Sequence, residues 1–192
     1  MAMVPEVPEA PDSPGLRGRR VTARAAALWF VAALAGSAVL GLLGGLIWGE
    51  FAPRTELQEV GAGTAEWVNV ETRAFFGADV WFSAIAVVAG LLTGVLGYRF
   101  AVAPRDGAGR AAVAGALILG AVAGTFVMLW LGEQIGLAAY NQHLASSPNG
   151  TLFPDSLALG SKSALAFWPL FTAIVLLVAE WGTGPARAEQ PE

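Results

Sequence analysis

The chain has no cysteine and a single histidine among its 192 residues. Without cysteine it forms no disulfide bond, thiolate metal site or iron–sulfur cluster, and it has no cysteine nucleophile. His143 alone cannot supply both axial ligands of a bis-histidine haem within one chain. A lone histidine in a polar stretch is also more typical of a solvated side chain than of a ligand. We therefore expect no bound metal ion and no cofactor.

Charged residues are scarce as well. They make up 14% of the chain, against about 25% in an average soluble domain, and hydrophobic residues make up 55%. The charges occur in blocks between long apolar stretches, which is typical of a membrane protein. The net charge of −4 therefore adds segments from both sides of a bilayer. The expected partner of the apolar stretches is the lipid bilayer, and we expect no binding to nucleic acid.

Four stretches are long and apolar enough to cross a bilayer. A helix rises 1.5 Å per residue, so about 20 residues cross the roughly 30 Å hydrocarbon core. A secretory signal peptide would also begin with basic residues, but Trp48, Glu50 and Phe51 do not form a small-residue cleavage site. A retained first helix is therefore favoured over a cleaved leader. The predicted spans are residues 25–48, 80–98, 111–132 and 164–181.

Because lipid offers no partner for backbone polar groups, these spans must be helices. The predicted fold class is an all-α membrane protein, a bundle of four transmembrane helices within residues 24–181. Residues 1–23 combine prolines, acidic residues and arginines with few apolar side chains, which predicts a disordered tail. Residues 182–192 are predicted to form a second, short polar tail.

The loop between the first two spans carries a strand pattern. Thr55–Val60 and Glu66–Val70 flank the sequence Gly61-Ala62-Gly63, and Val68 and Val70 alternate with polar neighbours. A period of two residues is typical of a half-buried strand. The pattern predicts a short β-hairpin in this first extracytoplasmic loop.

The second half of the chain contains further local signals. Nothing between Ala111 and Leu144 breaks the helical pattern firmly, so the third helix is predicted to continue past the membrane surface through Tyr140. Residues 146–153 predict a loop, because they contain Pro148 and Asn149-Gly150. Asp155 is the predicted N-cap of the fourth helix. Pro169 predicts a kink in that helix, since proline has no amide hydrogen to donate.

The positions of the basic residues predict the orientation. The N-terminal tail, the loop from Arg99 to Arg110 and the C-terminal tail hold eight of the eleven Lys and Arg residues. Basic loops remain in the cytoplasm, so both termini and the middle loop of this multi-pass protein are predicted to be cytoplasmic. Six of the seven tryptophans lie in the spans, mostly near their predicted ends. Amphipathic indole rings prefer this level of the membrane. These residues are Trp29, Trp48, Trp81, Trp130, Trp168 and Trp181.

Glycines recur at four-residue spacing in the first three spans. A spacing of four returns to one face of a helix, and a face without side chains lets a neighbouring helix approach closely. The predicted packing residues are Gly41, Gly45, Gly49, Gly90, Gly94, Gly120 and Gly124. Two interpretations stay open: packing within one bundle, or self-association through an exposed glycine face.

One group of charges falls at the predicted outer ends of the four spans. Each span contributes one residue, and a fifth comes from the loop between the first two spans. The group is Glu50, Asp79, Glu133, Lys162 and Arg73. These side chains could form a polar cup that binds a cation, a headgroup or a partner segment. Alternatively they are structural, with Asp79 favoured by a helix N-terminus and Lys162 either extending toward the headgroups or paired with Glu133.

The interior of the spans offers no charge for transport. Its polar groups are hydroxyls, which can bond back to their own helix. An intramembrane charge costs on the order of 3 kcal/mol to bury and is usually retained for ion or proton movement. Its absence argues against a proton-coupled carrier. We also find no HExxH, GxSxG or glycine-rich phosphate-binding motif, so the sequence does not indicate an enzyme.

Several segments together resemble a known family. They are WGEFAP at Trp48–Pro53, ETRAFFGADVWF at Glu71–Phe82, GLLTG at Gly90–Gly94 and LALGSKSALAFWP at Leu157–Pro169. In these segments the chain resembles an uncharacterised family of actinobacterial four-span membrane proteins, domain of unknown function 2567. The resemblance covers residues 24–181 and implies a location in the plasma membrane. It implies no activity, cofactor or site.

Two classes of function follow. The sequence favours a non-enzymatic envelope protein that binds a partner, either another membrane protein or further copies of itself. The alternative is a small carrier or channel for a lipid-like or cationic solute, with the outer charges as its vestibule. The separation of those charges in three dimensions distinguishes the two classes.

Overall fold

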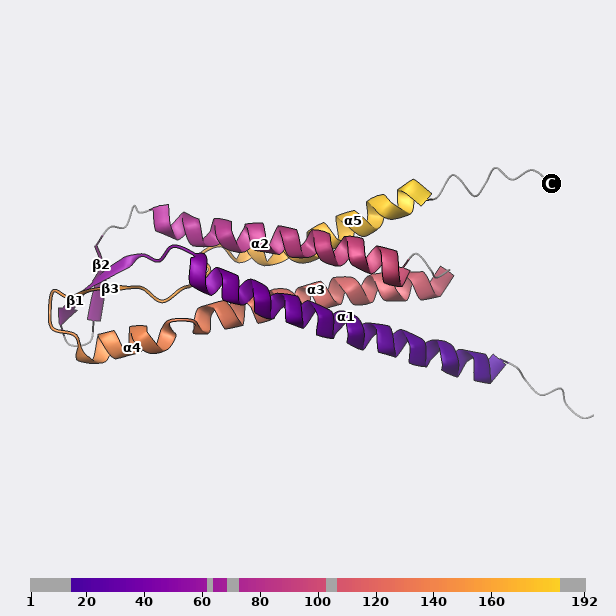
Figure 1. Ribbon diagram of the computed structural model, residues 1–192, viewed down its shortest axis with the longest axis horizontal. Coiled ribbons are helices and arrows are strands. Elements are labelled where there is room, and N and C mark those ends of the chain that lie inside the picture. Colours follow the sequence, from indigo (N-terminus) through magenta and orange to yellow (C-terminus); the bar gives the residue numbers. More distant parts are fainter. Residues whose placement is uncertain (1–14, 62–63, 69–72, 103–106, 184–192) are drawn as a thin grey trace, which may run out of the picture.

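The computed structural model describes residues 15–61, 64–68, 73–102 and 107–183. Four long helices lie along one another in an elongated bundle (Figure 1). They are α1 (Gly15–Phe51), α2 (Arg73–Gly97), α3 (Gly107–Gln134) and α5 (Phe167–Thr183). A short helix, α4 (Leu137–Ser146), and three short strands lie together beyond one end of this bundle.

The four long helices supply four stretches that are long and apolar enough to cross a membrane. These stretches are Ala27–Phe51, Phe76–Val102, Gly109–Ser146 and Lys162–Gly182. They confirm the four predicted spans. The third stretch includes α4 and has 38 residues, which would reach about 57 Å, almost twice the hydrocarbon core. The short helix therefore extends beyond the part of the chain that can lie in the membrane.

The described ends of the chain lie together at the far end of the bundle from the sheet. The first turns of α1 and α3 and the last turns of α2 and α5 all lie at this end (Figure 1). Helix α1 begins at Gly15, so the predicted disorder of residues 1–23 is wrong for residues 15–23. Arginine, which occurs three times in this stretch, is a good helix former. Residues 1–14 and 184–192 lie outside the described part.

Glycines set the close packing of α1 on α3. A methyl group on Gly45 would lie 2.8 Å from the carbonyl oxygen of Met128, and one on Gly124 would lie 2.7 Å from that of Ser37. The same holds between α2 and α5, where a methyl group on Gly90 would lie 2.7 Å from the Trp168 carbonyl oxygen. All seven predicted packing glycines face another segment of the same chain. The contacts at these positions are therefore intramolecular.

Two tryptophans fill the core of the bundle. Trp48 and Trp168 are both completely buried. The Trp48 ring meets Phe82 edge to face at 5.1 Å, and its indole nitrogen donates to the Ala78 carbonyl oxygen at 2.8 Å. The Trp168 indole donates to the Thr93 hydroxyl at 3.1 Å. Both indole nitrogens are therefore satisfied inside the bundle, and the predicted level of these two residues in the membrane stays a prediction.

The predicted hairpin is confirmed, and it belongs to a three-stranded sheet. Strand β1 (Glu56–Gly61) lies between β2 (Thr64–Trp67) and β3 (Leu152–Pro154), and both pairings are antiparallel. The third strand corrects the prediction that residues 146–153 form only a loop. Three residues are too few to show a period in the sequence, and it is the pairing with β1 that makes them a strand.

The predicted continuous helix through Tyr140 is wrong, because the chain turns between α3 and α4. Gly136 adopts a φ of 86°, a left-handed conformation that glycine reaches without steric cost. The Arg54 guanidinium occupies the space beside it, and a methyl group on Gly136 would lie 3.0 Å from its Nη1. A backbone turn with an arginine packed against it therefore ends the third spanning helix.

The start of the fourth spanning helix also differs from the prediction. Asp155 is not its N-cap, because residues 155–161 are irregular and a 3₁₀ turn, η2 (Lys162–Ala166), precedes α5. Pro169 lies in the first turn of α5 and not in its interior. Proline costs little there because the first amides of a helix have no intrahelical acceptor.

Candidate functional site

The five charges predicted to form an outer cup lie near the same end of the bundle but do not form one site. Glu50 and Lys162 are exposed, and Glu133 is half-buried near the end of α3. Among the residues that the structure describes, no ion pair joins any two of the five. Arg73 is the first residue of α2, and its side chain lies outside the described part. The predicted pairing of Lys162 with Glu133 is therefore not present.

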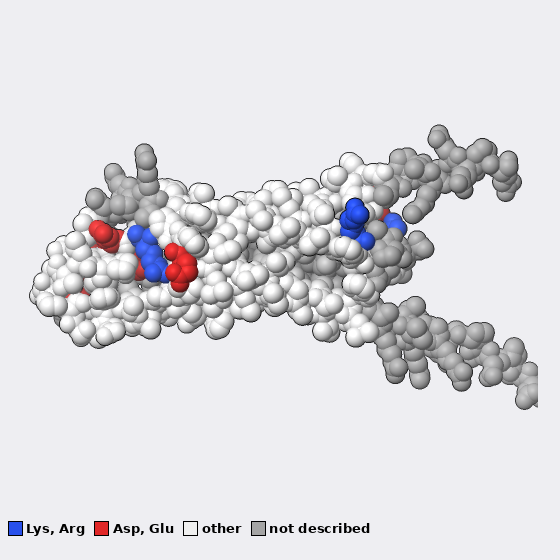
Figure 2. Space-filling model, in the orientation of Figure 1, with Lys and Arg blue, Asp and Glu red and all other residues white. Residues whose placement is uncertain are grey.

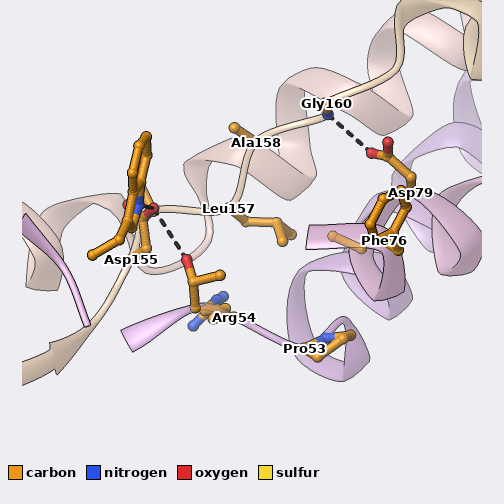
Figure 3. A pocket seen from close by; sticks show the side chains of 12 residues that line it. Pro53, Arg54, Phe76, Asp79, Asp155, Leu157, Ala158 and Gly160 are labelled. Carbon is orange, nitrogen blue, oxygen red and sulfur yellow. Dashed lines mark hydrogen bonds between the residues drawn. The ribbon is translucent and has the colours of Figure 1, made fainter. Parts of the chain in front are cut away.

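The Asp79 carboxylate is hydrogen-bonded to the backbone of another segment. Its two carboxylate oxygens each accept one amide hydrogen, from Gly160 and from Ser161, both at 2.9 Å. Figure 3 shows the first of these bonds. Asp79 is in the second turn of α2, so the prediction that it sits at a helix N-terminus was wrong. It fastens the loop before α5 to the flank of α2.

Arg54 joins the ends of two spanning helices. Its Nη2 donates to the carbonyl oxygen of Gly49 at 2.7 Å and to that of Ile135 at 3.1 Å. Carbonyl groups at the C-terminal end of a helix lack intrahelical donors, and a cation there is favoured by the helix dipole. One guanidinium thus satisfies the ends of both α1 and α3. Sequence reasoning treated Arg54 only as a loop charge.

Asp155 links segments of the sheet in the way that Arg54 links the helix ends. Its Oδ2 accepts hydrogen bonds from the Thr55 hydroxyl at 3.2 Å and from the Trp67 indole at 3.1 Å. Its amide donates to the Thr55 carbonyl oxygen at 2.8 Å. One residue therefore ties the start of β1, the end of β2 and the segment after β3 together. No short-range signal could reveal this role, because Thr55 is 100 residues away.

These three charged residues line a pocket of about 350 Å³ at the base of the sheet. Trp67 and Phe76 contribute aromatic walls, and the loop 155–160 closes one side (Figure 3). Each charged group is already bonded to the protein, as described above, and most of the lining is apolar. The pocket therefore offers no assembled pair of nucleophile and base. Within the described residues, no three His, Asp or Glu side chains could hold a metal ion.

The opposite end of the bundle has its own junction. Arg110 and Glu180 form an ion pair at 3.0 Å that links α3 to α5. The Tyr98 hydroxyl, in the π-helical turn η1 (Tyr98–Val102) that follows α2, donates to the Ala179 carbonyl oxygen at 3.2 Å.

On the face of the molecule shown in Figure 2, charged side chains gather at the two ends and leave an uncharged band between them. The band is the surface that a bilayer would cover.

We call the three strands and α4 the cap. Beyond its pocket, the cap presents the outer face of the sheet, on which every described side chain is exposed. Two of these side chains are acidic and three are apolar, and none is basic. They are Glu56, Gln58, Val60, Thr64, Glu66, Leu152 and Pro154. The inner face carries the buried side chains of Leu57 and Phe153 and, beside them on β1, the buried carboxylate of Glu59.

His143 lies on α4, where it is exposed. Its ring stacks on Phe153 at a centroid separation of 5.4 Å. It therefore helps to hold α4 against β3, and Ser147 is the one polar side chain that the structure places beside it, at 3.4 Å.

The fold is thus a bundle of four helices that are each long and apolar enough to cross a membrane, with the small cap at one end. No protein-family model, curated protein or solved structure matches the chain. The resemblance to the four-span actinobacterial family therefore stays a prediction from the sequence segments alone.

Proposed function

We propose that this is a non-enzymatic, multi-pass protein of the plasma membrane whose cap binds another membrane or envelope protein on the outer side. The observation that carries the proposal is the exposed outer face of the sheet. Val60 and Leu152 are 47% and 55% exposed there, beside Glu56 and Glu66. Large apolar side chains held outside the spanning segments, flanked by charge of one sign, are typical of a surface that a partner covers.

Hydrogen bonds hold the cap together and join its base to the helices, which favours a binding role. Asp155 links the start of β1, the end of β2 and the segment after β3, and Arg54, just before β1, bonds to the ends of α1 and α3. A surface that is fixed before binding loses less conformational entropy when a partner docks. The two acidic residues and the lack of basic ones on this face favour a partner segment that carries lysine or arginine.

The alternative function, a small carrier or channel, has less support. Among the described side chains of its predicted vestibule no ion pair is present, and Asp79 is bonded to the backbone. Toward the cap end of the bundle, Trp48, Phe82, Met128 and Trp168 are fully buried in one apolar cluster. Side chains of this size leave the described core without a polar path.

The proposal is tested with a photo-crosslinking amino acid at Leu152, on the outer face of β3, in cells that produce the full chain. Asn141, which is exposed on α4, carries the same amino acid in the control. We expect one discrete adduct from position 152 and none from position 141. Glu66→Lys should reduce the yield at 152, because it reverses a charge on the same face. Equal adducts at both positions, or none at 152, would contradict the proposal.

The mass of the adduct identifies the kind of partner. An adduct of twice the chain mass indicates a second copy of this protein, whereas any other discrete mass indicates a different protein. Both are partners in the sense of the proposal.

A further inference from the structure

A second pocket, of about 420 Å³, lies in the cap between the sheet and α4. Helix α4 covers one side of the inner face, because its Tyr140 and His143 rings pack on Phe153 of β3 at centroid separations of 6.1 and 5.4 Å. Strand β2 is the edge strand on the other side of β1, and the inner face stays open beside it. We call this opening the edge pocket. Its lining residues are Leu57, Ala65, Glu66, Trp67, Tyr140 and Asp155.

Two aromatic side chains line the edge pocket. Trp67 of β2 lies opposite Leu57 in the sheet and is 51% exposed. Its indole nitrogen donates to Asp155 Oδ2 at 3.1 Å, which holds the ring beside the carboxylate. Tyr140 of α4 supplies the second ring. The faces of aromatic rings attract cations, and tryptophan does so most strongly.

The charges that line the edge pocket are negative. Glu66 and Asp155 line it, and among the described residues no lysine or arginine does. The hydrogen bonds that Asp155 accepts from Thr55 and Trp67 come from neutral donors, so they orient its charge without compensating it. Burial and the neighbouring Asp155 charge raise the pKa of Tyr140, and its phenol therefore stays neutral near pH 7. A site with these charges attracts cations and repels anions.

A third carboxylate lies next to the edge pocket on the same face of the sheet. Glu59 is directly opposite Ala65, and directly opposed residues of an antiparallel pair share a face. Glu59 is only 3% exposed, and within the described part of the chain its Oε2 has no hydrogen-bond partner. A buried charge without a partner is costly, and a cation in the adjoining pocket would offset part of that cost.

The lining favours an organic cation over a metal ion. A hard metal ion needs several oxygen ligands at about 2.0–2.6 Å, and in the part of the chain that the structure describes no three His, Asp or Glu side chains could hold one. The pocket is also far larger than a bare ion. An alkylated ammonium group suits it better, because its methyl or methylene groups can contact ring faces while its charge lies near carboxylates.

From the aromatic lining, the uncompensated carboxylates and the open volume, we infer that the edge pocket binds the ammonium group of a small organic cation from the surrounding solution. The lining residues belong to the cap and to the residue that follows β3, so the ligand reaches them outside the spanning helices. This inference does not depend on the function proposed for the outer face of the sheet.

Isothermal titration calorimetry of the purified full chain in maltoside micelles tests the inference, with choline as the probe. The control ligand is the neutral analogue of choline in which carbon replaces the ammonium nitrogen, because it has the same shape without the charge. We expect saturable binding of choline and at least about tenfold weaker binding of the neutral analogue. Equal binding of the two ligands, or no binding of choline, would overturn the inference.

Two exposed glutamates provide a matched pair of variants. Glu66 lines the edge pocket, whereas Glu56 lies on the same sheet and does not line it. Both side chains are exposed, so both variants are expected to fold. Glu66→Gln should weaken choline binding at least fivefold, and Glu56→Gln should change it by less than twofold. Equal losses would show a general attraction of cations to an acidic surface and contradict a defined site.

Tyr140 tests the aromatic lining. Tyr140→Phe keeps the ring and should bind choline within about twofold of the native chain, whereas Tyr140→Leu removes the ring and should bind at least fivefold more weakly. Near-UV circular dichroism checks that both variants keep their packing, since Tyr140 also contacts Phe153. Equal binding by two folded variants would refute the role of the ring.

Nanodiscs of two compositions distinguish a free solute from a lipid headgroup. Phosphatidylcholine carries the trimethylammonium group of choline, whereas phosphatidylglycerol has no ammonium group. Free choline should bind equally well to the chain in both kinds of disc. Binding that is lost only in phosphatidylcholine discs would contradict a free solute, because headgroups would then fill the pocket.

Discussion

Single side chains at the cap end hold segments that are far apart in the sequence. Arg54 bonds to the ends of two helices, Asp79 to the loop before α5, and Asp155 to two strands. In each case a charged group satisfies backbone or side-chain polar groups that have no partner within their own element. In place of the predicted outer cup, these three residues each link separate segments of the chain.

Arg54 gives the sharpest prediction at the residue scale. Arg54→Gln should lower the free energy of unfolding by about 1–3 kcal/mol, because two carbonyl groups lose a charged donor. Arg54→Lys should lie between the native chain and Arg54→Gln, since a single ammonium reaches both carbonyl oxygens less well than a guanidinium does. The measurement is equilibrium unfolding of the protein in detergent micelles, followed by tryptophan fluorescence.

The control for this prediction is Arg99→Gln. Arg99 is exposed at the opposite end of the bundle, and exposed substitutions usually change stability by less than about 0.5 kcal/mol. If both variants lose the same stability, the loss comes from charge in general and the role assigned to Arg54 is wrong.

At the scale of elements, the helices pack in two close pairs. Glycines bring α1 against α3 and α2 against α5, with backbone atoms of one helix near the bare face of the other. Between α1 and α2, a methyl group on Gly44 would lie 3.1 Å from the Ile85 side chain, and no backbone atom of α2 is among its nearest neighbours. Not every glycine of α1 packs in this way: Gly45 meets α3, whereas a methyl group on Gly36 would meet nothing within 4 Å.

Gly90→Ala tests this pairing. The added methyl group would lie 2.7 Å from the Trp168 carbonyl oxygen, so α2 and α5 must separate. Overpacking of this kind costs about 1–3 kcal/mol, measured by the same unfolding experiment. Gly36→Ala adds an identical group in open space and should leave stability unchanged or slightly higher. Equal losses in the two variants would refute the assignment of Gly90 to a close helix contact.

At the scale of the whole molecule, the cap and the described termini occupy opposite ends of the bundle (Figure 1). The basic residues of the sequence predict that the termini are cytoplasmic, which would place the cap outside. Because the native chain has no cysteine, a single introduced thiol reports its own position without any background.

Asn149→Cys in the cap and Gly109→Cys near the start of α3 test this orientation. Both positions are exposed. A membrane-impermeant maleimide added to intact cells should label the thiol at 149 at once and the thiol at 109 only after the cells are permeabilised. The reverse pattern would place the cap in the cytoplasm and contradict the function proposed for it.

The sequence alone determined the four spans and the hairpin, because both depend on local hydrophobic patterns. A run of apolar residues long enough to cross a bilayer has a helix as its only stable form in lipid, and alternation beside a glycine-rich turn specifies two paired strands. The lack of a known catalytic motif is also a matter of local sequence, because such motifs are short stretches of residues.

Only the tertiary structure decided where the charged side chains go. The bonds of Asp79 to Gly160, of Arg54 to Ile135 and of Asp155 to Thr55 each span more than 80 residues. The left-handed turn at Gly136 and the third strand were decided in the same way. Each depends on a neighbour that is distant in the chain, and local sequence patterns carry no record of such neighbours.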